Sequence, residues 1–104
     1  MSRIGLFVKF TAQAGQRDAL LQQPLHAAEL VADAPGCELW LVSTSPTEAE
    51  TVCATEVWRS QAEHDASLAG EAVKSAIGRT GPLLAGPPQR IDVLPAGGKG
   101  LDRT

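Results

Sequence analysis

The chain has 104 residues, of which 43% are hydrophobic and 20% are charged, which is the size and composition of one ordinary globular domain. Its net charge of −3 and its nine scattered Lys and Arg residues argue against nucleic-acid binding, which requires clustered basic side chains. No apolar run approaches the roughly 18 residues of a membrane span, and no cleavage site follows the N-terminal apolar run that Lys9 interrupts, so we expect no membrane contact, no signal peptide and a cytoplasmic location.

Residues 3–11 alternate between apolar and other side chains, which is the pattern of a strand with one buried face. The buried face would carry Ile4, Leu6, Val8 and Phe10. Residues 16–32 then place apolar side chains at helical spacing, and the Pro and Gly within residues 33–36 indicate the end of that helix. Pro24 lies inside the predicted helix, where it removes a backbone hydrogen bond, so we expect a kink there.

A hairpin follows the helix. Residues 37–44 and 51–59 are rich in β-branched and aromatic side chains, and the intervening residues 45–50 are polar. Two such segments joined by a short polar turn predict an antiparallel pair of strands.

The register of this hairpin decides whether Cys37 and Cys53 can form a disulfide. With the turn centred near Thr47 and Glu48, Cys37 faces a position near Trp58. That position is about five residues, or roughly 16 Å, from Cys53 along an extended strand. Because a disulfide requires Cα atoms within about 7 Å, we predict two reduced thiols.

Ser60 marks the start of the next predicted helix. Glu63 follows three residues later, and a Ser and a Glu at this spacing form a capping box. The helix is expected to run to about Ser67, which places His64 one turn from its start.

The rest of the chain completes a split βαβ arrangement. Residues 71–77 predict a further helical piece, the Gly- and Pro-rich residues 78–88 are expected to be irregular, and residues 90–94 form a last short strand. The order β-α-β-β-α-β predicts an α+β, ferredoxin-like antiparallel sheet with helices on one face. We expect one domain over residues 1–95 and a flexible tail over residues 96–104.

The face of the sheet without helices is expected to be apolar. Phe7, Val57 and either Val42 or Trp40 would lie there, and a contiguous apolar patch of this kind is unfavourable in open water. We therefore predict a homodimer that pairs through the open sheet face.

Four segments of the chain resemble one known family. Residues 55–68 resemble the E-x-W-x-S-x-x-x-H-x-x-S stretch of the antibiotic biosynthesis monooxygenase superfamily, through Glu56, Trp58, Ser60, His64 and Ser67. Residues 14–21 and 34–37 are also similar to this family, and residues 95–101 are similar to the tail of its quinol monooxygenase branch.

This resemblance implies a dimeric α+β barrel with a cavity between each sheet and its helices. It also implies oxidation of a small phenol, quinol or related aromatic by O₂ without metal, flavin or haem. Haem-degrading relatives carry Asn, Trp and a haem-ligating His where this chain has Val8, Ser67 and Ile77, so the resemblance does not extend to haem degradation. The chain also departs from better-studied members in containing no Tyr.

His64 is the candidate acid–base residue, and Glu56 is a candidate substrate contact. Histidine exchanges protons near neutral pH and suits removal of a phenolic proton, whereas a structural His64 would hydrogen-bond to the sheet end or to Glu56. A carboxylate in mid-strand requires a partner, for which Arg90 and His64 are candidates. Glu56 would then contact substrate or orient His64. His26, on the first helix, is a weaker candidate.

The two tryptophans are candidate substrate contacts. Trp58 shares a strand face with Glu56 and would either stack on an aromatic ring or fill the core. Trp40 would contact substrate, pack in the interior or lie in the dimer interface.

Three functions remain open at this point. The first is a cofactor-independent monooxygenase for a small aromatic or quinol. The second is a non-catalytic dimeric module that binds a small ligand or serves in stress, because a fold alone does not fix a function. The third is an isomerase or lyase that acts by proton transfer.

Overall fold

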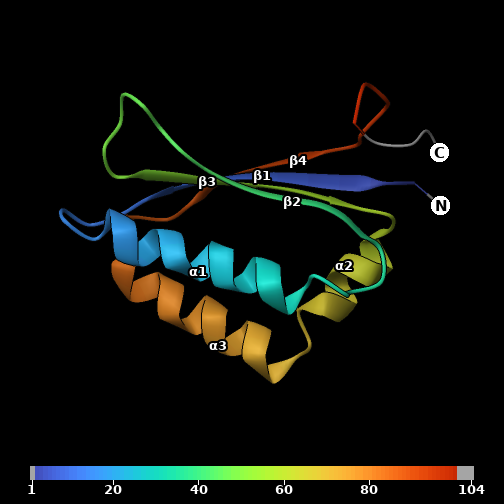
Figure 1. Cartoon of the computed structure of the whole chain (residues 1–104), viewed down its shortest axis with the longest axis horizontal. Coiled ribbons are helices and arrows are strands. Elements are labelled where there is room, and N and C mark those ends of the chain that lie inside the picture. Colours follow the sequence, from blue (N-terminus) through green and yellow to red (C-terminus); the bar gives the residue numbers. More distant parts are fainter. Residues whose placement is uncertain (1, 101–104) are drawn as a thin grey trace.

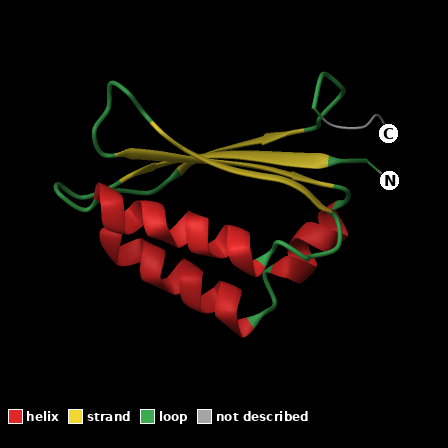
Figure 2. Ribbon diagram, in the orientation of Figure 1, coloured by secondary structure: helices red, strands yellow, loops and turns green. Residues whose placement is uncertain are grey.

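The computed structural model describes residues 2–100, which form one four-stranded antiparallel sheet with three helices packed on one of its faces (Figures 1 and 2). In chain order the elements are β1 (Ile4–Thr11), α1 (Arg17–Leu30), β2 (Cys37–Thr44), β3 (Thr51–Trp58), α2 (Gln61–Ser67), α3 (Glu71–Thr80), a 3₁₀ turn η1 (Gly81–Leu83) and β4 (Gln89–Val93). The strand order is β2-β3-β1-β4. The predicted ferredoxin-like α+β fold is confirmed.

The hairpin has the predicted register. Cys37 lies opposite Trp58 across β2 and β3, while Cys53 pairs with Lys9 and Ser43 further along β3. Both thiols are free. The two cysteines therefore lie too far apart along the hairpin to form a disulfide, as the position of the turn predicted.

The helices differ from prediction mainly at their ends. α1 remains helical through Pro24, whose carbonyl oxygen accepts a hydrogen bond from Trp40 Nε1 at 3.0 Å. α3 extends to Thr80 and continues into η1, so the expectation that irregular structure begins at Gly78 was wrong. Packing of α3 beside α1 outweighs the cost of about 1 kcal/mol that a helical Gly carries. Pro82 is in the first turn of η1, where an amide N–H is not needed.

The part of the chain after β4 has no regular secondary structure as far as Gly100. The predicted tail over residues 96–104 falls partly on residues 101–104, which lie outside the described residues. None of the helices between residues 2 and 100 is long and apolar enough to cross a membrane.

The interior is closely packed at one end of the sheet. Leu20 of α1 and Val52 of β3 are fully buried there, with Ala12 beside them. Trp58, at the far end of β3, is also fully buried. The space between these two packed ends is the location of the cavity described below.

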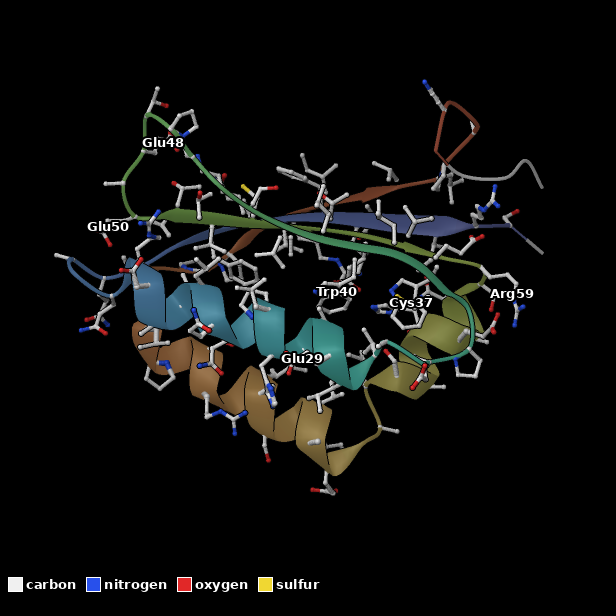
Figure 3. The ribbon with its side chains drawn as sticks, in the orientation of Figure 1. Glu29, Cys37, Trp40, Glu48, Glu50 and Arg59 are labelled. Carbon is white, nitrogen blue, oxygen red and sulfur yellow. The ribbon has the colours of Figure 1, made fainter. Side chains whose placement is uncertain are left out.

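Phe7, Leu41, Ile91 and Val93 expose apolar side chains, and strand pairing places them on the open sheet face. Figure 3 shows that side chains project from this face, away from the helices. Directly paired residues share a face of a sheet, and Phe7 pairs with Thr55 and Ile91, while Leu41 pairs with Thr55.

The prediction that Val42 or Trp40 lies on this open face was wrong. Trp40 pairs with Glu56 and Val42 pairs with Ala54, whose side chains face the helices. Val42 packs beside the buried core and Trp40 bonds to α1. Leu39 and Leu41 occupy the open face instead, since they alternate with these two residues.

Gly36, before β2, occupies a position that only glycine fits. Its φ is +85°, and an added Cβ would lie 2.6 Å from Glu63 Cδ. Its carbonyl oxygen accepts a hydrogen bond from Arg59 N at 2.7 Å, so this turn holds the start of α2 against β2. We expect Gly36→Ala to lower the free energy of unfolding by about 2–4 kcal/mol, from backbone strain and steric overlap together.

Urea denaturation followed by circular dichroism measures this loss, with Gly15→Ala as the matched control. Gly15 has a similar φ of +79° but open space around it, so its substitution reports backbone strain alone, about 1–2 kcal/mol. Equal losses in the two variants would contradict the role given to the Glu63 contact.

Candidate functional site

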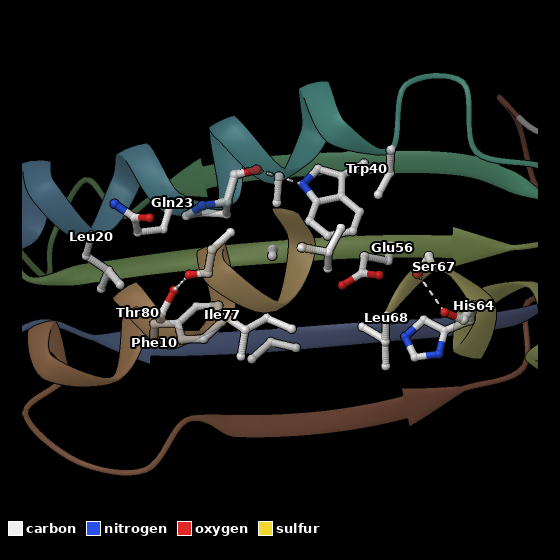
Figure 4. A pocket seen from close by; sticks show the side chains of 17 residues that line it. Phe10, Leu20, Gln23, Trp40, Glu56, His64, Ser67, Leu68, Ile77 and Thr80 are labelled. Carbon is white, nitrogen blue, oxygen red and sulfur yellow. Dashed lines mark hydrogen bonds between the residues drawn. The ribbon is translucent and has the colours of Figure 1, made fainter. Parts of the chain in front are cut away.

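A cavity of about 160 Å³ lies between the sheet and the helices. Most of its walls are apolar, and the polar side chains are few (Figure 4). The lining residues are Val8 and Phe10 of β1; Leu20, Gln23, Pro24 and Ala27 of α1, with Val31 after it; Trp40 of β2; Ala54 and Glu56 of β3; His64 and Ser67 of α2, with Leu68 after it; and Val73, Ala76, Ile77 and Thr80 of α3.

Glu56 places its carboxylate in this cavity from the middle of β3. Trp58 Nε1 donates a hydrogen bond to Glu56 Oε1 at 2.9 Å. Within residues 2–100 the other carboxylate oxygen, Oε2, accepts no hydrogen bond from a protein group. The partner that a buried carboxylate requires is therefore Trp58. The two partners considered from the sequence, Arg90 and His64, act on Glu56 only through their charges.

Burial raises the pKa of Glu56 above its ordinary value of 4.5. The hydrogen bond from Trp58 and the positive charges of His64 and Arg90 oppose this rise but do not cancel it. Desolvation disfavours the charged form of a carboxyl group, so this carboxylate is a stronger base than one on the surface.

Trp58 itself does not line the cavity. Its side chain is fully buried behind Glu56 and meets the His64 ring edge to face, with ring centroids 5.6 Å apart and an angle of 80° between the planes. Its position fits a residue that orients Glu56 and His64, one step removed from a ligand.

His64 is buried and faces the cavity from α2. Its Nδ1 lies 3.1 Å from Asp65 Oδ1. Hydrogen bonds from Gln61 and then from His64 lower the pKa of the Asp65 carboxyl, which stays charged beside the ring. A carboxylate only accepts hydrogen bonds, so it favours the tautomer with hydrogen on Nδ1 and leaves Nε2 with the lone pair.

Trp40 also faces the cavity, from β2. Its Nε1 donates to the Pro24 carbonyl oxygen at 3.0 Å, which connects β2 to α1. His26 lies elsewhere: it is exposed on α1, and its Nδ1 is 3.6 Å from Glu29 Oε2. The fold thus brings Glu56, His64 and Trp40 to one cavity and leaves His26 outside it.

Sequence reasoning missed the contribution of α1 and α3 to this site. Gln23 and Thr80 line the cavity, and neither carries a motif that would identify it. Helical spacing does place Thr80 one turn after Ala76, on the face that turns toward α1, but this indicates burial only. Val8, Ser67 and Ile77, which were compared with haem-degrading relatives, all line the same cavity.

Among residues 2–100, no group of three or more His, Cys, Asp or Glu side chains is arranged to hold a metal ion.

The fold and the cavity define a ferredoxin-like α+β protein with a small, mostly apolar site that contains one half-buried carboxylate. Residues 3–79 match the model of the family described as antibiotic biosynthesis monooxygenase. The chain belongs to this family, as its sequence motifs indicated.

Solved structures support this assignment. A protein of Chloroflexus aurantiacus, provisionally named an antibiotic biosynthesis monooxygenase, is 36% identical and has a TM-score of 0.86, with 97% of this chain and all of that one covered. A protein of the same provisional name from Caulobacter crescentus is 24% identical, with 88% of each chain covered and a TM-score of 0.81. A third, from Nitrosomonas europaea, has a TM-score of 0.86 at 11% identity with 95% of each chain covered. The last two show likeness of fold alone. A comparison with curated protein sequences gave no match.

Proposed function

We propose that this protein is a cofactor-independent monooxygenase that oxidises a small phenol or quinol with O₂. The observation that carries the proposal is the Glu56 carboxylate, which faces an apolar cavity while Trp58 holds one of its oxygens. Membership in a family of monooxygenases supports the reaction class.

The volume of the cavity limits the substrate. An apolar cavity of about 150 Å³ in another protein is large enough to bind benzene, and the cavity here is about 160 Å³. A single aromatic ring with small substituents fits this space without rearrangement. Trp40, Phe10 and Ile77 are the side chains that would contact the ring.

Glu56 would start the reaction by taking the O–H proton of the bound phenol. The phenolate then gives one electron to O₂, and the resulting superoxide and aryloxyl radical combine by forming a C–O bond at a ring carbon that bears hydrogen. The peroxide anion then takes this proton from Glu56, which gives a hydroperoxide on the ring.

Loss of the ring C–H proton to Glu56 completes the reaction, because it breaks the O–O bond and forms a ring carbonyl. The hydroxide that is released leaves as water with that proton. One O₂ is consumed per substrate, with one oxygen atom in the quinone product and the other in water. The apolar walls favour this sequence by keeping water from the anion and the radical.

His64 is a second proton carrier in this scheme. It lies at the same end of the cavity as Glu56 (Figure 4), and its partner Asp65 is exposed. The imidazole is therefore positioned to exchange protons between the buried site and solvent.

An oxygen electrode tests the proposal with the purified protein and a panel of one-ring phenols and quinols, after treatment with a chelator. We expect one O₂ consumed per quinone formed, with no added cofactor. Binding of the same compounds without O₂ uptake above background would reject the oxygenase and favour the ligand-binding module.

The active protein is proposed to be a homodimer that pairs through the open sheet face. Phe7, Leu41, Ile91 and Val93 expose apolar side chains there, and burial of this surface would stabilise the pairing.

Leu41→Lys places a charge on this face and should weaken the dimer about tenfold or more, because a charge buried without a partner is unfavourable in an apolar interface. Sedimentation velocity at micromolar concentration measures the change. Leu25→Lys is the control, since Leu25 is similarly exposed but lies on α1, outside the cavity lining. A wild-type monomer at these concentrations would exclude the proposed pairing.

A further inference from the structure

The indole N–H groups at the site are already used by the protein. Trp40 Nε1 donates to the Pro24 carbonyl oxygen at 3.0 Å. Trp58 Nε1 donates to Glu56 Oε1 at 2.9 Å. Each indole has a single N–H, so neither remains available to a ligand in the cavity.

The two hydroxyl groups that line the cavity are committed in the same way. Ser67 Oγ donates to the His64 carbonyl oxygen at 2.6 Å, and Thr80 Oγ1 donates to the Ala76 carbonyl oxygen at 3.0 Å. A hydroxyl has one hydrogen and two lone pairs. With the hydrogen directed to the backbone, each oxygen offers only lone pairs to a ligand.

The ionisable groups add further acceptors. Glu56 Oε2 is an open carboxylate oxygen. When the His64 ring carries a single hydrogen, directed to Asp65, its Nε2 presents a lone pair. Gln23 differs, because its oxygen accepts from Arg79 Nε at 3.3 Å and its amide N–H groups remain available. Among the described residues, the side-chain polar atoms at the cavity are therefore mostly acceptors.

These acceptors lie at two ends of the cavity. Figure 4 shows Thr80 beside Phe10 at one end and Glu56, His64 and Ser67 at the other. The side chains between them are apolar. A ring in this space would thus present its substituents to acceptors on both sides.

We propose that Thr80 is a specificity-determining residue and that the cavity recognises one-ring aromatics with hydrogen-bond donors at opposite positions, such as diols and aminophenols. Glu56 accepts a hydrogen bond from the ring hydroxyl whose proton it later removes, and Thr80 accepts one from the donor group at the opposite position of the ring. When a ring hydroxyl is oxidised to a carbonyl, the ligand loses a hydrogen-bond donor. The lone pairs of the carbonyl oxygen then face the acceptor atoms of the cavity, with which they form no hydrogen bond. The site therefore binds the reduced ligand more tightly than its oxidised product, which favours product release.

This inference rests on the proposed function for turnover, but ligand binding tests it without turnover. Isothermal titration calorimetry under anaerobic conditions compares hydroquinone, which has two donors, with 4-methylphenol, in which a methyl group replaces the distal hydroxyl. In Thr80→Val, which replaces the hydroxyl by a methyl group, we expect the Kd of hydroquinone to rise about threefold to tenfold. The Kd of 4-methylphenol should change less than twofold, and Thr80→Ser should restore hydroquinone binding.

Equal effects of Thr80→Val on both ligands, or no effect on either, would overturn the inference. The inference would also be overturned if 4-hydroxybenzaldehyde bound more tightly than hydroquinone and this preference disappeared in Gln23→Met. The Gln23 amide would then select a ligand with a hydrogen-bond acceptor at the distal position. Oxygen uptake with 4-methylphenol is independent of this comparison. If oxygen uptake is observed but Thr80→Val does not change the Kd of hydroquinone, only the inference about Thr80 is rejected. If Thr80→Val changes this Kd but no oxygen uptake is observed, only the oxygenase proposal is rejected.

Discussion

Glu56→Gln is expected to lower the rate of oxygenation by about 10²–10⁴-fold, because it removes the proposed general base from the cavity. Gln has nearly the same shape as Glu, and its carbonyl oxygen can still accept the hydrogen bond from Trp58 Nε1. The Kd of a phenol without turnover should therefore change much less than kcat. Oxygen uptake and anaerobic calorimetry on the same preparation separate the two quantities.

Two further variants complete this experiment. Glu29→Gln removes an exposed carboxylate of α1 and should leave kcat unchanged. His64→Gln should have a smaller effect than Glu56→Gln, since His64 is assigned proton exchange with solvent. If His64→Gln abolished turnover while Glu56→Gln kept more than a tenth of it, His64 would be the base and our assignment would be wrong.

Trp58→Phe is expected to have two effects through Glu56. Loss of the N–H leaves the half-buried Glu56 carboxylate without its donor, and loss of ring volume leaves a gap in the packing. We expect the free energy of unfolding at neutral pH to fall by about 2–4 kcal/mol. The pKa of Glu56 should also rise further, because the hydrogen bond that lowers it is gone.

The pH profile distinguishes this positioning role from simple packing. In the proposed mechanism, activity requires ionised Glu56, so the acidic limb of the pH–activity profile should shift to higher pH in Trp58→Phe. Val52→Ala serves as a control, since Val52 is a fully buried residue of β3 in the packed end of the core, outside the cavity lining. A stability loss without a shifted limb in Trp58→Phe would limit Trp58 to packing.

The raised pKa of Glu56 should also make the free energy of unfolding of the wild-type protein depend on pH in a predictable direction. The folded pKa of Glu56 lies above its ordinary value of 4.5, so the folded chain holds this proton more tightly than the unfolded chain. The contribution of Glu56 to the free energy of unfolding therefore falls as pH rises from 4.5 through the raised pKa, and it is constant above that. Subtraction of the Glu56→Gln curve isolates this contribution.

Much of the fold could be predicted from local patterns. Alternation over β1, the polar turn after β2 and the Ser60 N-cap each depend on residues close together in sequence. Ser60 Oγ accepts a hydrogen bond from Glu63 N at 3.2 Å, as the capping box predicts. The Glu63 carboxylate accepts hydrogen bonds from Ser60 Oγ and Arg59 Nε rather than from the Ser60 backbone N–H that a capping box would use. The turn position predicted that Cys37 lies opposite a residue near Trp58, and the structure pairs these two residues after a register shift between Cys37 and Leu39.

The candidate site was predictable only in part. The resemblance pointed to Glu56 and His64, and both line the cavity. It did not indicate that Trp58 donates to Glu56 from behind the cavity wall, or that Trp40 faces the helices. These facts depend on how helices pack over a sheet, which alternation along one strand does not specify.

The sequence by itself therefore determined the order of elements, the hairpin register and the type of fold, because hydrophobic period, turn residues and caps act over a few residues. The tertiary structure alone decided which face of β2 is covered, how far α3 continues, and that Gln23 and Thr80 share a cavity with Glu56. These outcomes arise from contacts between residues distant in sequence, where packing of whole helices outweighs local preference.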